Sequence, residues 1–98
     1  MWAQIVKSRM KPGVEGDIAE VREQIRSRIS QRPGLVRSFW MGNQRDPQEY
    51  YTFVVFESEE QARAGERELD QDAVFQRVRD LGEGTPEFVD LEVIESIP

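Results

Sequence analysis

The stretch Glu49–Glu57 reads EYYTFVVFE and is the strongest strand signal in the chain. It consists mainly of aromatic and β-branched residues, the types that are enriched in β-strands. Apolar side chains occupy both of its alternating faces over much of its length, which a strand needs only when it is covered on both sides. The segment therefore predicts a central strand of a sheet.

Two further strands are predicted upstream of this segment. Residues 2–10 alternate loosely between apolar and polar side chains and end at the turn signal Lys11-Pro12-Gly13. Leu35–Asn43 carries Val, Phe, Trp and Met, and the turn-forming residues 42–47 then connect it to the central strand as a hairpin.

Three helices complete the pattern. Val14–Arg32 has one apolar stripe at spacings of three and four, formed by Ile18, Val21, Ile25 and Ile29. Ser58, with Gln61 three residues later, predicts the capped start of a second helix that ends near Leu69. A short third helix is expected after Asp72.

The last strand is predicted at Phe88–Glu95, where Val89, Leu91 and Val93 share one face. The resulting order is βαββαβ, with a short extra helix before the last strand, and residues 1–98 are expected to form a single domain. This is the α+β, ferredoxin-like class, which has one four-stranded antiparallel sheet with its helices on one side.

Composition excludes several kinds of site. The chain has no Cys and no His, so it lacks disulfides, thiolate nucleophiles and the commonest metal ligands, and no metal site or cofactor is predicted. A net charge of −6 disfavours nucleic-acid binding. The apolar stretch at the N-terminus is too short for a signal peptide or a membrane span, so a cytoplasmic location is expected.

The predicted sheet carries more large aromatic residues than one helical layer can cover. They are Trp2, Trp40, Tyr50, Tyr51, Phe53 and Phe56. An apolar patch of that size is unusual on a soluble monomer. A small chain without disulfides or metal also needs additional buried surface. We therefore expect a homodimer that is formed through the open face of the sheet, giving a dimeric α+β barrel.

Over nearly its whole length the chain resembles the antibiotic biosynthesis monooxygenase-like family of dimeric α+β barrels. The landmarks that carry the resemblance are Lys11–Gly13, Pro33–Leu35, Asp46–Tyr51, Val55–Ala62 and Ala73–Phe75. The family includes cofactor-independent quinone-forming monooxygenases and haem-degrading oxygenases. The resemblance implies the fold, a pocket between the sheet and the helices, and a small aromatic or quinol-type substrate.

The chain departs from the haem-degrading members of that family. Those relatives bind iron through a His and also use an Asn in the first strand and a Trp late in the third. This chain has no His, and the corresponding positions hold Gln4, Val6 and Ser8 in the first strand and Phe56 in the third. Haem degradation is therefore not expected, whereas oxygenation without a cofactor needs only a dry pocket and donors that stabilise a substrate anion.

Gln4 and Arg37 are the predicted catalytic residues. Gln4 and Ser8 share one face of the first strand and could donate hydrogen bonds to a phenolate, although a place near water at the strand end would also explain them. Arg37 interrupts the apolar second strand and could hold a substrate carboxylate or enolate. It could equally be a charge that protects an edge strand.

Ser8 and four aromatic residues are the predicted substrate contacts. Trp40 and Tyr51 offer flat rings for stacking, and Tyr51 adds a hydroxyl. Phe56 and Phe75 would line the same cavity. Packing in the core or in a dimer interface is the alternative role for all four.

Two other functions remain open. The chain could be a non-catalytic, small-molecule-binding or stress-related homodimer. It could also be an isomerase or cyclase, which would need a buried base such as Asp90, Glu92 or a tyrosine.

Overall fold

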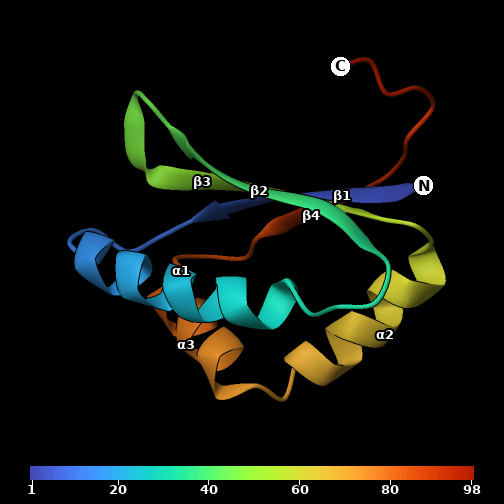
Figure 1. Cartoon of the computed structure of the whole chain (residues 1–98). Helices are drawn as coiled ribbons and strands as arrows, with labels where there is room; N and C mark the ends of the chain where they lie inside the picture. The colour runs from blue at the N-terminus through green and yellow to red at the C-terminus, as the bar shows by residue number, and fades with distance from the viewer.

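The computed structural model describes all residues from 1 to 98 and has the predicted antiparallel α+β architecture (Figure 1). Its elements are β1 (Trp2–Arg9), α1 (Glu15–Ile29), β2 (Leu35–Asn43), β3 (Asp46–Phe56), α2 (Glu59–Leu69), α3 (Ala73–Leu81) and β4 (Glu87–Glu92). The four strands form one antiparallel sheet in the order β2-β3-β1-β4. The prediction of a ferredoxin-like βαββαβ chain is confirmed.

The strand over Glu49–Glu57 is central, as its composition predicts, because β3 pairs with β2 on one side and with β1 on the other. It begins at Asp46, three residues earlier than expected. Only Gln44 and Arg45 lie outside the two strands of the hairpin. The side-chain carbonyl of Asn43 accepts a 2.9 Å hydrogen bond from the backbone N–H of Arg45, which stabilises this tight connection.

The last strand is shorter than predicted. The alternating pattern predicts a strand to Glu95, but β4 ends at Glu92 because its partner β1 begins at Trp2, directly opposite. The backbone N–H of Val93 makes one more bond, 3.0 Å to the carbonyl of Met1, and beyond it there is no strand to pair with. Residues 93–98 therefore leave the sheet, and they lie on the side away from the helices (Figure 1).

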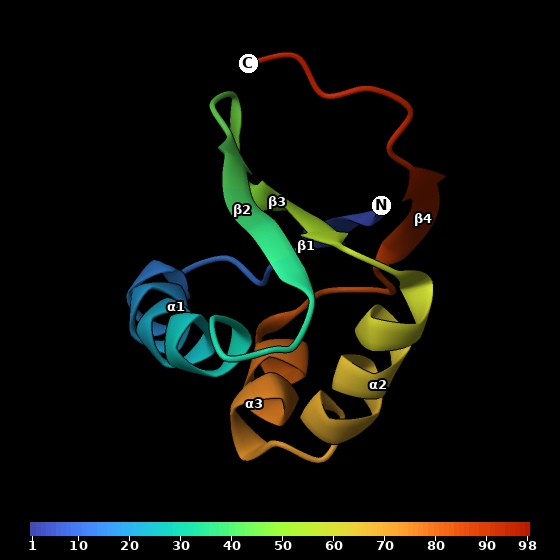
Figure 2. The same ribbon diagram turned by 45° about the vertical axis from the view of Figure 1, so that its right-hand side comes forward.

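All three helices lie on one side of the sheet (Figure 2). The predicted N-cap of α2 is confirmed, because Ser58 Oγ accepts a 3.2 Å hydrogen bond from the backbone N–H of Gln61. Asp72 caps α3 in the same way, through the N–H of Val74 at 2.8 Å. These caps satisfy N–H groups that have no partner within the helix.

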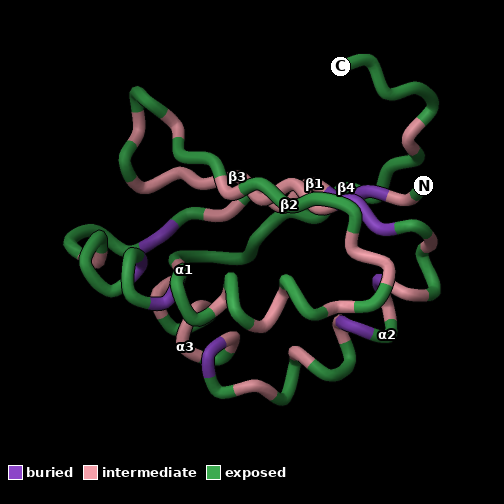
Figure 3. Tube along the Cα trace, viewed as in Figure 1, coloured by how far each residue is buried: buried purple, intermediate pink, exposed green.

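Few residues are buried in a single chain (Figure 3). Only ten of the 98 residues are buried, and Val21 in α1 is the largest side chain that is fully buried. Gln4 is the one buried polar side chain. The core of one chain is therefore thin, and much apolar surface lies outside it.

Replacing the cap of α2 should weaken the fold. In Ser58→Ala the N–H of Gln61 loses its acceptor, and we expect the free energy of unfolding to fall by about 1 kcal/mol. Urea denaturation followed by circular dichroism measures this change. Ser96→Ala, in the C-terminal segment, is the control and should leave the midpoint unchanged; an equal loss in both variants would contradict the capping role.

Candidate functional site

Strand pairing divides the side chains of the sheet between two sides. Gln4 lies opposite Val54 on β3 and opposite Asp90 on β4, so these three side chains share a side. Arg63 of α2 contacts Asp90, which shows that this is the side that faces the helices. We call it the helix side and the other the open side.

The helix side carries a polar network around the buried Gln4, which is 7% exposed. Gln4 Nε2 donates a 2.9 Å hydrogen bond to Asp90 Oδ1. Arg63 Nη2 donates to the other oxygen, Asp90 Oδ2, at 2.8 Å. The guanidinium carbon of Arg63 also lies 5.1 Å from the centre of the Trp2 ring, a cation–π distance. Three elements, β1, β4 and α2, are thereby joined.

Negative charge is in excess in this network. Arg63 also bonds Glu66 at 3.1 Å and Glu59 at 3.3 Å, so three carboxylates share a single guanidinium. The hydrogen bond from Gln4, together with the bond and charge of Arg63, holds the pKa of the Asp90 carboxyl below its usual range. Asp90 is therefore ionised at neutral pH.

Four of the predicted site residues lie on the helix side. They are Gln4, Ser8, Trp40 and Phe56. The ring of Trp40 meets the ring of Tyr50 edge to face, with the centroids 6.2 Å apart. Phe56 is buried next to the start of α2, whereas Ser8 and Trp40 are partly exposed. Phe75 is half-buried on α3.

Arg37 and Tyr51 lie on the open side, so one chain does not bring them together with Gln4. The guanidinium of Arg37 lies 5.8 Å from the ring centre of Phe39, its neighbour on the same face of β2. The hydroxyl of Tyr51 donates a hydrogen bond to Glu49, and this bond raises the pKa of Tyr51. The register in which the strands pair determines that these residues and Gln4 lie on opposite sides of the sheet. That register cannot be predicted from the strand sequences alone.

Sequence reasoning missed Arg63 altogether and treated Asp90 only as a candidate base. Arg63 stands among the charges of α2, 27 positions before Asp90, and its helix pattern resembles that of any solvated face. The contact arises only in the folded chain, which brings Arg63 of α2 to Asp90 of β4. No local sequence signal identifies it.

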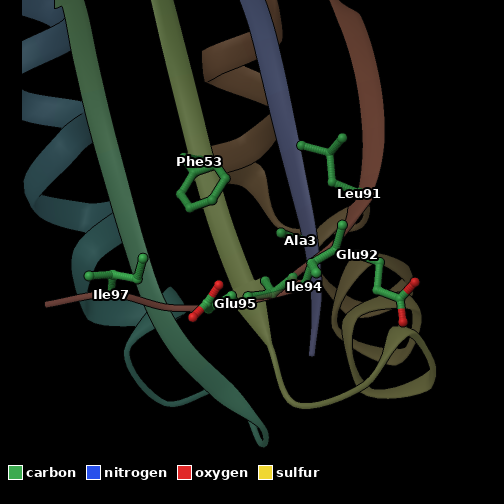
Figure 4. A pocket seen from close by; sticks show the side chains of 8 residues that line it. Ala3, Phe53, Leu91, Glu92, Ile94, Glu95 and Ile97 are labelled. Carbon is green, nitrogen blue, oxygen red and sulfur yellow. The ribbon is translucent and has the colours of Figure 1, made fainter.

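A hollow of about 500 Å³ lies on the open side (Figure 4). Its lining comprises Ala3, Phe53, Leu91, Glu92, Val93, Ile94, Glu95 and Ile97. Figure 4 shows the C-terminal segment running across the strands at this place. A second hollow, of about 330 Å³, is lined only by Gly and polar residues, from Lys7 to Arg9, Glu49 and the 83–87 region. Neither hollow reaches Gln4 or Phe56, so the pocket that was expected there is not among them.

No group of three or more acidic side chains is arranged to hold a metal ion. None of the helices is long and apolar enough to cross a membrane.

Solved structures share this fold across almost the whole chain. A candidate antibiotic biosynthesis monooxygenase from Nitrosomonas europaea is 16% identical, with a TM-score of 0.82 over 97% of this chain and 100% of its own. A variant of SnoaB, a cofactor-independent oxygenase from Streptomyces nogalater, is 17% identical, with a TM-score of 0.78 over 99% and 97%. A variant of MhuD with manganese protoporphyrin bound is 12% identical, with a TM-score of 0.76 over 100% and 99%.

These similarities confirm the resemblance to antibiotic biosynthesis monooxygenases at the level of the fold. No family model matches the chain, and no curated protein matches it in sequence. Fold likeness at such low identity leaves the chemistry to be argued from the residues themselves.

The Gln4–Asp90 bond can be tested by titration. Gln4→Leu keeps the bulk of the side chain but removes the donor, so we expect the pKa of Asp90 to rise toward its ordinary value, as measured by NMR of the carboxyl carbon. Because the folded-state pKa is depressed, the stabilisation that Asp90 provides is present above about pH 4 and is lost as pH falls through the lowered pKa. Ser8→Ala, on the same face of β1, should leave the pKa of Asp90 unchanged.

Proposed function

We propose that the protein is a cytoplasmic, cofactor-independent monooxygenase-like homodimer that oxidises a small aromatic or quinol-type substrate between the sheet and the helices. The observation that carries this proposal is the buried amide of Gln4 on a side of the sheet that is otherwise rich in aromatic residues. Likeness of fold to SnoaB, an oxygenase without a cofactor, supports the reaction class.

The helix side offers apolar surface that its own helices leave uncovered. Phe88 faces this side, opposite Val6, yet it is 59% exposed. Trp40 is also only partly covered. Flat apolar surface beside one or two polar groups is typical of sites for aromatic ligands. Gln4 and Ser8 would orient the ligand, and Trp40, Phe56 and Phe75 would exclude water from it.

The proposed reaction needs no imidazole or thiolate, and the chain has neither. In the oxidation of an anthrone to a quinone, the substrate reduces O2 directly. The ring CH2 loses two hydrogens and gains one oxygen atom as a carbonyl, and the second oxygen atom leaves as water. Arg37 and Tyr51 have no part in this site because they lie on the open side.

A second copy of the chain is the proposed cover for the open side. Exposed apolar residues gather there on β2, β4 and the C-terminal segment: Phe39, Met41, Val89, Leu91, Ile94 and Ile97. Ile94 is 94% exposed and Ile97 is 79% exposed.

The lack of Cys agrees with the proposed location in a reducing cytoplasm.

The exposed area of one chain also favours a dimer. A folded monomer of 11.4 kDa is expected to expose about 5,800 Å². This chain exposes 6852 Å². The excess of about 1,100 Å² is comparable to the roughly 800 Å² that each partner buries in an interface of standard size.

A non-catalytic, ligand-binding homodimer is the second candidate. The bond between Gln4 and Asp90 favours it, because the one buried polar side chain already has a partner within the chain.

Oxygen uptake with a panel of anthrones and quinols distinguishes the two. The wild type should consume one O2 for each anthrone oxidised, and Gln4→Ala should lower kcat/KM by about tenfold, the loss expected for one hydrogen bond. Gln44→Ala, in the hairpin turn, is the matched control and should match the wild type. Saturable binding without oxygen uptake would instead establish the non-catalytic candidate.

Light scattering tests the assembly. The wild type should have the mass of two chains at micromolar concentration, and Leu91→Glu should yield single chains because it places a charge in the proposed interface. Ser38→Glu, on the helix side of β2, should remain dimeric. A wild type of single-chain mass would refute the proposed interface.

A further inference from the structure

The two ends of the Gln4 side-chain amide have different surroundings. Nε2 donates to Asp90, and this bond is the only one that the side chain makes. The carbonyl oxygen Oε1 has no hydrogen-bond partner, and it is not among the polar atoms that are sealed from solvent. A hydrogen-bond acceptor on the helix side is therefore free.

Charge determines which end of the amide faces Asp90. The carboxylate accepts one hydrogen bond on each oxygen, from Gln4 and from Arg63, and it is ionised at neutral pH. An ionised carboxylate has no proton to donate, so the carbonyl of Gln4 cannot turn toward it. The Asp90–Arg63 pair thereby holds the amide with its carbonyl directed away from β4.

The same groups disfavour an anion next to Gln4. A phenolate or enolate bound by the remaining N–H of Nε2 would lie close to Asp90, whose oxygen is 2.9 Å from that nitrogen. The only cation in contact with Asp90 is Arg63, which also forms ion pairs with Glu59 and Glu66. Like charges at such short range repel when water is excluded.

We propose that the ligand on the helix side binds through an un-ionised hydroxyl group, which donates a hydrogen bond to Oε1 of Gln4, and that Asp90 and Arg63 are positioning residues that fix this orientation. The inference rests on the proposed function, because it assumes a ligand between the sheet and the helices. It replaces the expectation that Gln4 donates to a phenolate. The substrate class is thereby narrowed to neutral phenols, enols and quinols.

A matched pair of redox-inert probes tests the inference through binding rather than turnover. 2-Naphthol and 2-methoxynaphthalene have the same ring system, and only the naphthol can donate a hydrogen bond. Calorimetry on the wild type should show about tenfold tighter binding of the naphthol, the worth of one hydrogen bond. Affinity should fall when the pH is raised until the naphthol ionises.

Variants of Gln4 and Asp90 distinguish a positioning role of Asp90 from a merely structural one. Gln4→Leu should bring the two affinities within about twofold of each other, because the acceptor is gone while the shape remains. Asp90→Asn should reduce the preference for the naphthol, because an Asn amide can accept or donate and the Gln4 amide is then free to turn. A merely structural role would weaken both ligands equally. Glu60→Gln, on α2 but outside the Arg63 cluster, is the control and should retain the wild-type ratio.

The outcomes distinguish this inference from the proposed function. If the wild type binds neither probe, the site on the helix side fails, and the assignment of the hydroxyl group fails with it. If both probes bind equally, if Gln4→Leu keeps the preference, or if ionisation strengthens binding, only the inference is overturned.

The NMR signals of the Gln4 amide give a readout without ligand. They should shift with the titration of Asp90, and an amide that does not respond would refute the orientation.

Discussion

The pairing of β1 with both β3 and β4 is the constraint on which the rest of the structure depends. Trp2 lies opposite Phe56 on one neighbour and opposite Glu92 on the other. Because side chains alternate along a strand, this register decides which of them face the helices. A shift by one residue would move Gln4 to the open side and Ile5 to the helix side. The polar network and the apolar open side both result from this one alignment.

The network on the helix side contributes more to orientation than to stability. Its ion pairs involve side chains that are a third or more exposed, and such pairs contribute little to the free energy of folding. These bonds nevertheless restrict the orientation of the Asp90 carboxylate, because one oxygen accepts from Gln4 of β1 and the other from Arg63 of α2. An exposed charge pair thus sets the direction of a buried neutral amide.

Local patterns were sufficient to predict most of the fold. The composition of Glu49–Glu57 identified a central strand, and Ser58 with Gln61 located the start of α2 within the sequence. The end of β4 could not be predicted, because it depends on where the partner strand begins. For the same reason the sequence did not show that Arg37 lies on the side opposite Gln4, or that Arg63 reaches Asp90. Alternation groups residues within a strand, but it does not say which side of one strand matches which side of the next.

The two sides of the sheet are both incompletely covered, and their chemistry indicates different occupants. On the open side, the hollow next to Phe53 is shallow and is partly formed by the C-terminal segment, with Ile94 and Ile97 still exposed. No buried polar group lies there to orient a small molecule, so a broad apolar protein surface fits it better. On the helix side, the exposed ring of Phe88 lies two residues along β4 from Asp90, the partner of Gln4. A second apolar surface on this side would leave the free acceptor of Gln4 without a partner. An unpaired acceptor costs free energy when it is buried by apolar groups, and a ligand hydroxyl removes that cost. We therefore propose different occupants for the two sides: a second copy of the chain on the open side and a small hydroxylated ligand on the helix side.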